Sequence, residues 1–139
     1  MLFDLTLLIL YLSLTNLYCI IMEQLLHYIW KHRILPLHEM HTTDGRTVEV
    51  IAPGLHNTHA GPDFFNAKLR IGGTLWVGNV EIHERSADWV LHQHDQDPAY
   101  NNVVLHVASV IDADVQTMDG THPPQMELKV PKYVLNNYL

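Results

Sequence analysis

Apolar residues recur along the chain at different spacings, and each spacing predicts one kind of element. Residues 23–35 carry apolar side chains three and four positions apart, which predicts an amphipathic helix ended by Pro36. Residues 47–52 alternate between polar and apolar, as half-buried strands do. Residues 102–110 are almost continuously apolar, which is typical of a buried strand, and residues 126–130 predict a final strand.

A predicted β-hairpin lies near the middle of the chain. Gly72 and Gly73 separate two strand-like runs, and paired glycines in that position favour a tight turn. In the second run, residues 75–83, period-two alternation puts Glu81 and His83 on one face. The polar end of this strand is therefore one-sided.

The length of the turn determines whether Asp63, which precedes the first run, joins that face. A two-residue loop pairs Asp63 with Ile82 and separates it from Glu81. A three-residue loop with a glycine bulge pairs Asp63 directly with Glu81. Neighbouring carboxylates repel each other, and a hard divalent cation is the usual means of keeping both ionised. Only the second register predicts a metal site, and the sequence leaves both registers open.

Pro62-Asp63, the hairpin and Glu81-x-His83 resemble the signature of the PD-(D/E)XK nuclease superfamily, with histidine in place of the usual lysine. The resemblance implies that Asp63, Glu81 and the carbonyl of Ile82 hold Mg²⁺ or Mn²⁺. It also implies that His83 takes the position of the lysine that helps to place the attacking water. Because histidine is mostly neutral at pH 7, it does not supply the permanent positive charge of lysine.

A longer resemblance begins at Met22. The strings LLHYIWK, GLHN, AGPDFFNAK, GTLWVGNVEIH, SADW and DPAYNNVVLHV are similar to a bacterial family of uncharacterised proteins, domain-of-unknown-function family 2851. The length of 139 residues leaves room for one domain, which we place at residues 22–130. The resemblance implies that residues 131–139 begin a C-terminal region that the family's members continue. It implies no particular activity.

Residues 1–21 are apolar and about long enough to span a membrane. They contain Asp4 and lack the basic start of an ordinary signal peptide. Three interpretations stay open, namely an extension from an upstream start codon, a membrane anchor and a signal segment. The first predicts a cytoplasmic protein, and the second predicts a domain tethered to a membrane.

Charge argues against an extended nucleic-acid-binding surface. The 139-residue chain has a net charge of −7, and its 8 basic residues form no stripe along the sequence. A duplex-binding surface normally needs clustered lysine and arginine to neutralise phosphates. A bound divalent ion and the 11 histidines could offset the local negative charge. Nucleic acid is therefore an expected partner only if the protein is a nuclease.

Several polar residues outside the signature are candidates for accessory roles. Glu23 lies in the first turn of the predicted helix, where the nuclease resemblance implies a glutamate that reaches the metal; the alternative is an acid that interacts favourably with the helix dipole. The loop before Asp63 contains His56 and His59, which are either solvated or close to a metal.

A polar run after the hairpin contains His92 and His94, which could supply a general base, a second metal ligand or a phosphate contact, or simply form a solvated loop. His106 lies inside the apolar run 102–110. It is either a hydrogen-bonded core residue or faces the same cleft as Glu81 and His83.

The predicted elements occur in the order α-β-β-β-α-β. We therefore expect an α/β (α+β) domain with a mixed sheet flanked by helices and a restriction-endonuclease-like core. By fold analogy the function is metal-dependent hydrolysis of nucleic-acid phosphodiesters. The alternative is a non-catalytic binding or assembly module, for which a two-residue hairpin turn that separates Asp63 from Glu81 would be the distinguishing feature.

Overall fold

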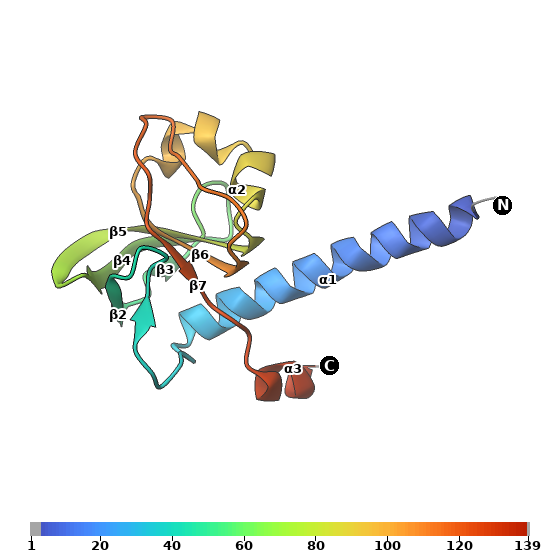
Figure 1. Ribbon diagram of the computed structural model, residues 1–139, viewed down its shortest axis with the longest axis horizontal. Coiled ribbons are helices and arrows are strands. Elements are labelled where there is room, and N and C mark those ends of the chain that lie inside the picture. Colours follow the sequence, from blue (N-terminus) through green and yellow to red (C-terminus); the bar gives the residue numbers. More distant parts are fainter. Residues whose placement is uncertain (1–3, 139) are drawn as a thin grey trace.

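A computed structural model describes residues 4–138, and its longest element is the helix α1, Leu5–Lys31. The side chain of Asp4 caps its N-terminus by accepting a hydrogen bond from the Thr6 N–H. The N-terminal part of α1 projects from the body of the protein, whereas the buried residues of α1 begin at Met22 (Figure 1). The predicted helix over 23–35 is thus the packed end of a longer one.

The predicted C-terminal boundary of this helix was wrong. The helix ends at Lys31, because Arg33 adopts a left-handed backbone conformation with φ of 56° and its N–H bonds back to the Trp30 carbonyl. The chain therefore leaves the helix before Pro36 is reached.

The projecting part of α1 is apolar on all sides. Its most apolar 18-residue window has a mean hydropathy of 2.0, and the helix meets the length and composition of a membrane span. A signal sequence near an N-terminus meets the same criteria. The structure is thus compatible with either an anchor or a signal.

A mixed sheet of seven strands forms the centre of the domain, with the order β1-β2-β4-β5-β6-β7 and with β3 paired to β4. Neighbouring strands are antiparallel from β1 to β5, and β5, β6 and β7 run parallel. The strands are β1 (Met40–His41), β2 (Thr47–Ala52), β3 (Leu55–His56), β4 (Phe64–Ile71), β5 (Thr74–Arg85), β6 (Val103–Val110) and β7 (Gln125–Glu127).

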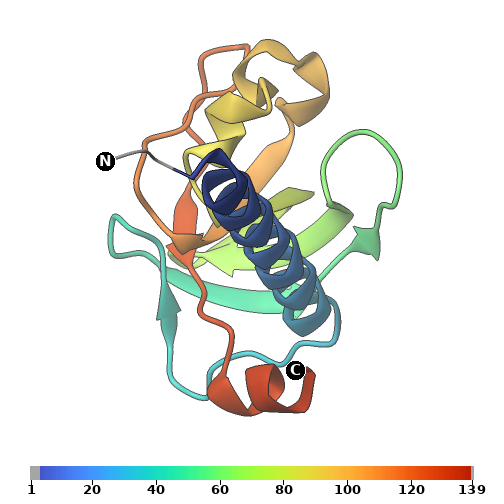
Figure 2. The same cartoon turned by 90° about the vertical axis from the view of Figure 1, so that its right-hand side faces the viewer.

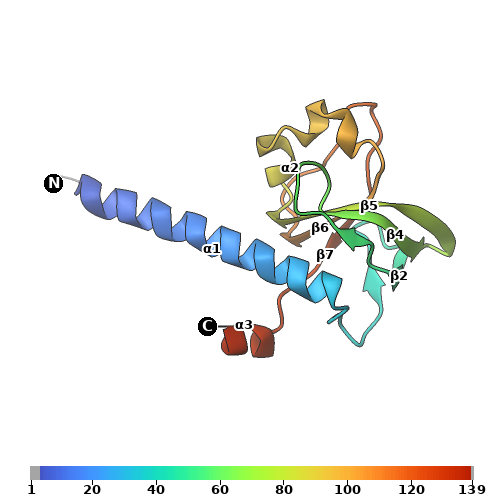
Figure 3. The same cartoon turned by 180° about the vertical axis from the view of Figure 1, so that it is seen from behind.

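The remaining helical elements are short. α2, Asp88–Leu91, and the 3₁₀ turns η1, His94–Gln96, and η2, Pro98–Tyr100, connect β5 to β6 and lie over one face of the sheet (Figure 2). α3, Lys132–Tyr138, follows the last strand and lies near the packed end of α1 (Figure 3). The mixed α/β architecture with helices on both sides of the sheet is confirmed.

Alternation along β5 divides its side chains between the two faces, as predicted. Val80 and Ile82 belong to the main apolar core together with Leu26 and Ile29 of α1. Glu81 and His83 point to the opposite face, towards α2 and the 3₁₀ turns. The polar strand end therefore lies between the sheet and its second layer.

The hairpin turn between β4 and β5 is the two-residue loop, with Ile71 paired to Thr74. One extra residue in β4 then shifts the register between Ala67 and Phe64, so that Phe64 pairs with Val80. The bulge contains Asn66, whose φ is 55° and whose N–H donates to the side chain of Asn79.

Our premise that turn length alone fixes the positions of the acids was wrong. The bulge moves the N-terminal end of β4 by one residue and places Asp63 beside Glu81 despite the two-residue turn. The turn therefore does not distinguish the nuclease from the binding module.

Candidate metal centre

Asp63 and Glu81 meet at the end of the β4–β5 hairpin. The Asp63 backbone N–H donates to Glu81 Oε1 at 3.2 Å, and the Ile82 N–H donates to Asp63 Oδ2 at 2.8 Å. These reciprocal bonds fix both carboxyl groups relative to the backbone. The three positions that the nuclease resemblance assigned to the metal therefore lie side by side.

The two acids have opposite pKa shifts. Burial, together with the neighbouring Asp63 carboxyl, raises the pKa of Glu81 well above its ordinary value. Burial also opposes the ionisation of Asp63, but His27 and Glu81 outweigh it and lower the pKa of Asp63 to about 2. Without a bound cation, Asp63 is therefore the ionised acid of the pair and Glu81 the acid that keeps its proton.

Two residues of α1, one helical turn apart, approach the acid pair. His27 Nε2 lies 3.3 Å from Asp63 Oδ2; this is an ion-pair contact, since Nε2 has no partner with hydrogen-bond geometry among the described residues. Burial disfavours the charged His27 ring, but Asp63 more than compensates and raises its pKa. Burial, and then the charge of Asp63, raise the pKa of Glu23 to about 7. Glu23 thus interacts with the centre.

The loop histidines differ in their positions. His56 Nε2 lies 3.3 Å from His27 Nδ1, and the His56 ring stacks on Phe64 with ring centroids 4.9 Å apart. His59 is exposed, and its backbone N–H donates to Asn57 within the loop. His56 therefore belongs to the surroundings of the acid pair and His59 does not.

Three imidazoles gather on the other side of Glu81. His83, His92 and His94 each place one ring nitrogen within 4.8 Å of the others. His94 Nε2 lies 2.7 Å from Glu81 Oε2, and His83 Nε2 lies 3.7 Å from the same oxygen. His83 and His94 are buried, whereas His92 is exposed. The cluster is accessible from the His92 side.

A buried chain of hydrogen bonds continues from His83 across the sheet. His83 Nδ1 lies 2.7 Å from His106 Nε2, and His106 Nδ1 lies 2.8 Å from Gln125 Oε1. Gln125 Nε2 in turn donates to the Ala113 carbonyl at 2.9 Å. His106 is thus both a hydrogen-bonded core residue and a neighbour of the cluster.

The buried imidazoles are uncharged at neutral pH. Burial lowers the pKa of His94 and of His106 to about 4, with neighbouring imidazoles adding to the shift. Burial, followed by the repulsion that a protonated His83 would meet from His106 and His94, lowers the pKa of His83 well below its ordinary value. These rings therefore offer lone pairs and not positive charge.

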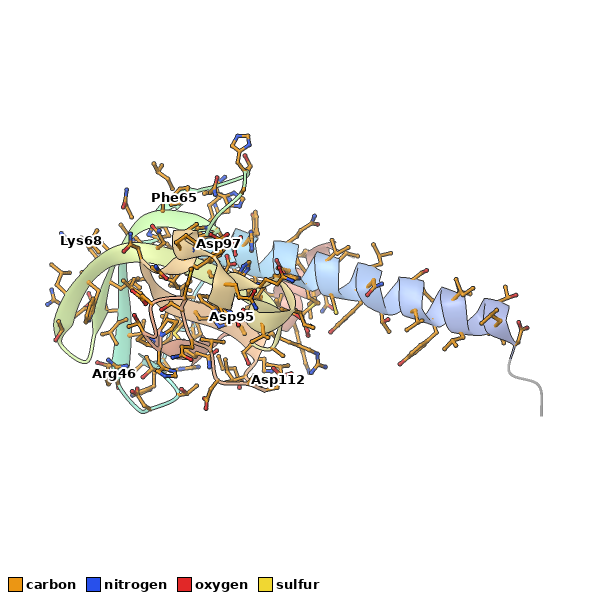
Figure 4. The ribbon with its side chains drawn as sticks, turned by 90° about the horizontal axis from the view of Figure 1, so that it is seen from above. Arg46, Phe65, Lys68, Asp95, Asp97 and Asp112 are labelled. Carbon is orange, nitrogen blue, oxygen red and sulfur yellow. The ribbon has the colours of Figure 1, made fainter. Side chains whose placement is uncertain are left out.

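The surroundings of the cluster are acidic. Asp95 and Asp97 lie on the segment that covers the sheet, while Arg46 and Lys68 lie towards its far end (Figure 4). A polyanion that approached the cluster would meet these carboxylates. Apart from His27, which is paired with Asp63, a positive charge in the centre would therefore have to come from a bound ion.

Two participants were missed in the sequence. His27 lies four residues after Glu23, and this spacing places both on one face of a helix, so the signal was available. Gln125 carried no comparable signal, because its position beside His106 depends on the parallel pairing of β6 with β7.

The fold and the clustered side chains define a mixed α/β protein with a candidate metal centre. The family model described as a protein of unknown function (DUF2851) matches residues 23–139, and the chain belongs to this family. The family assignment made from the sequence strings is thus confirmed. Comparison with curated proteins and with solved structures gave no match.

Proposed function

We propose that the protein is a divalent-metal-dependent hydrolase that cuts nucleic-acid phosphodiester bonds. The observation that carries the proposal is the contact between half-buried Asp63 and buried Glu81, two acids whose shared proton a hard cation would replace. Asp63, Glu81 and the carbonyl of Ile82 would hold Mg²⁺ or Mn²⁺. Such an ion lowers the pKa of bound water and stabilises developing charge on phosphate.

The arrangement of elements supports this proposal. With the two-residue strands β1 and β3 set aside, the elements α1, β2, β4, β5, α2 and β6 follow the α-β-β-β-α-β order of the restriction-endonuclease-like core. The acids lie at the end of the central hairpin, where the PD-(D/E)XK signature has them. The order of the elements therefore supports a resemblance to these nucleases in fold as well as in the short signature.

The protein's own residues would divide the remaining tasks. His83 occupies the position of the signature lysine, but its ring is neutral and its Nδ1 is engaged with His106. It would therefore accept a proton from water or bind metal through Nε2. Glu23 and His27 would orient the acids from the α1 side.

A specific observation favours the second candidate, a non-catalytic module that binds a metal through the same residues. Asp95 and Asp97 beside the cluster, together with a net charge of −7, oppose binding of a polyanion. In that case the centre would be a structural or sensory metal site. A membrane partner would require α1 to be inserted.

The test is Mn²⁺ binding, measured by calorimetry on the full chain in mild detergent, alongside cleavage assays on labelled DNA and RNA. The variants are Asp63→Asn and Glu81→Gln, and the matched control is Asp114→Asn at an exposed position. We expect about one equivalent of Mn²⁺ to bind, both site variants to lose it, and the control to keep it.

Cleavage that depends on Mn²⁺ and on both acids would support the hydrolase. Binding without cleavage of any substrate would favour the module. Binding that neither substitution weakens would overturn both candidates at this site.

A further inference from the structure

We propose a second metal position, distinct from the acid pair, in which His83, His92 and His94 bind a borderline transition-metal ion such as Zn²⁺ or Co²⁺. The proposal does not depend on nuclease activity. It rests on the geometry of the three rings and on the direction of the hydrogen bonds behind them.

The spacing of the three rings is close to that of a metal site. Two imidazole nitrogens bound to one tetrahedral Zn²⁺ at about 2.1 Å each lie about 3.4 Å apart. The three nitrogens lie within 4.8 Å of one another, so they must approach by at most about 1.4 Å to bind one ion. His92 is exposed and can rotate to provide it, whereas His83 and His94 are held by the surrounding protein.

The hydrogen-bond chain determines which nitrogen of His83 is free. The Ala113 carbonyl can only accept, so Gln125 must direct its amide N–H towards it and its Oε1 towards His106. His106 Nδ1 therefore carries the proton. Because a neutral imidazole has one N–H, His106 Nε2 accepts, and His83 Nδ1 is the donor across the 2.7 Å contact.

It follows that His83 Nε2 carries a lone pair. This atom faces the cluster, since it lies 3.7 Å from Glu81 Oε2. A metal-bound histidine characteristically donates its other N–H to an acceptor that fixes its tautomer and orientation. His106 and Gln125 provide this support before any ion is present.

The remaining ligands are arranged by packing. The His94 ring stacks on Tyr100 with centroids 3.8 Å apart and contacts Trp89 edge-on. Exposed His92 leaves one side of the cluster open, which provides room for a water molecule or a substrate group as a further ligand.

The chemistry of the donors separates this position from the acid pair. Imidazole nitrogens favour borderline ions, whereas carboxylate and carbonyl oxygens favour Mg²⁺ and Mn²⁺. Glu81 lies between the two positions, with Oε1 near the Asp63 N–H and Oε2 near His94. The two positions are therefore adjacent but take different classes of metal.

The experiment titrates the full chain with Co²⁺ in mild detergent and follows visible absorption, because four-coordinate Co²⁺ with nitrogen ligands absorbs strongly. Calorimetry with Zn²⁺ measures the affinity. The first variant is His92→Ala, which removes an exposed side chain without opening the core. The second is Gln125→Met, which removes the hydrogen-bond acceptor that fixes the tautomer of His106 and, through it, that of His83. The control is His59→Ala, an exposed histidine outside the cluster.

We expect one equivalent of Co²⁺ to bind with a four-coordinate spectrum. His92→Ala should weaken binding at least about tenfold, Gln125→Met by about 10-fold to 100-fold, and His59→Ala should have no effect. Absence of stoichiometric binding would overturn the proposal. Binding that His92→Ala leaves unchanged would also overturn it, and so would binding that His59→Ala weakens equally. Either result would indicate that Co²⁺ binds only to scattered surface histidines.

Asp63→Asn distinguishes this proposal from the proposed function. It should abolish Mn²⁺ binding at the acid pair while the Co²⁺ spectrum persists. Loss of the Co²⁺ spectrum in Asp63→Asn would show that the imidazole position is not distinct, and would overturn this inference.

Discussion

Replacing Glu23 with glutamine tests whether the first helix contributes to the charge balance of the centre. The Glu23 carboxyl is half-buried, and burial and the charge of Asp63 raise its pKa from 4.5 to about 7. A carboxyl whose pKa is raised on folding favours the folded state most when it is protonated. Its contribution is complete below pH 4.5 and is lost as the pH rises through about 7.

The size of the effect follows from the pKa difference. A shift of about 2.5 pKa units, from 4.5 to about 7, corresponds to about 3.4 kcal/mol at 1.36 kcal/mol per unit. Because the side chain keeps part of its solvent contact, we reduce this value to roughly 1–2 kcal/mol. The metal-free Glu23→Gln protein should therefore be more stable than the wild type by that amount at pH 8, and about equal to it at pH 4.

The assay is urea unfolding of the full chain in mild detergent with EDTA, followed by tryptophan fluorescence at pH 4, 6 and 8. Buried Trp30 and Trp89 report on the two layers of the domain. Glu49→Gln, at an exposed position paired with Arg70, is the matched control and should change stability by less than about 0.5 kcal/mol at each pH. If Glu23→Gln changes stability equally at pH 4 and pH 8, Glu23 does not interact with Asp63 as argued.

Three further predictions concern other parts of the domain. Gly78→Ala should destabilise by about 1–3 kcal/mol in urea unfolding, because an added Cβ would lie 2.3 Å from Val104 Cγ1; exposed Val77→Ala serves as the control. Ser86→Ala should cost about 1–3 kcal/mol in the same assay, since buried Ser86 Oγ accepts the Asp112 N–H at 2.8 Å. Metal-free unfolding in the Glu23→Gln background should show stability rising from pH 4 to 6.5, because burial lowers the pKa of His83, His94 and His106 and the unfolded rings are protonated first; together they outweigh Glu81, whose raised pKa acts in the opposite direction.

Local patterns predicted the elements that depend on near neighbours in the sequence. The two faces of β5 followed from alternation alone, and Glu81 and His83 were correctly placed together. The packed half of α1 followed from its apolar spacing. Its projecting half carried no stripe, because residues 5–21 are apolar on every side, and periodicity therefore could not define the helix start.

Features that depend on a single backbone conformation could not be predicted. The bulge at Asn66 needs one positive φ and one hydrogen bond from the Asn66 N–H to a side chain of the neighbouring strand, and the sequence shows neither. Gln93 likewise adopts a φ of 59° just before η1. The sequence revealed the polar run around His92 and His94 but not which rings turn inward.

The contacts behind His83 depend on distant parts of the chain. His106 and Gln125 come together because β6 and β7 pair in parallel, with His106 directly opposite Gln125. Parallel pairing requires a crossover, and its register is set by packing and not by a local turn. The tautomer of His83 is therefore a property of the assembled sheet.

The electrostatics of the centre favour ion binding over direct phosphate recognition. The protein has a net charge of −7, yet its buried histidines are neutral and its paired acids favour sharing a proton. Direct recognition of phosphate requires fixed positive charge on the protein. A metal ion instead requires lone pairs, and it stabilises paired carboxylates that would otherwise be costly to ionise together. The His83 position illustrates the difference, because this ring, which the nuclease resemblance puts in place of a lysine, offers a lone pair and no charge. Under the proposed function, any affinity of this centre for an anion would follow from the charge of the bound metal, and removing the metal should remove the affinity.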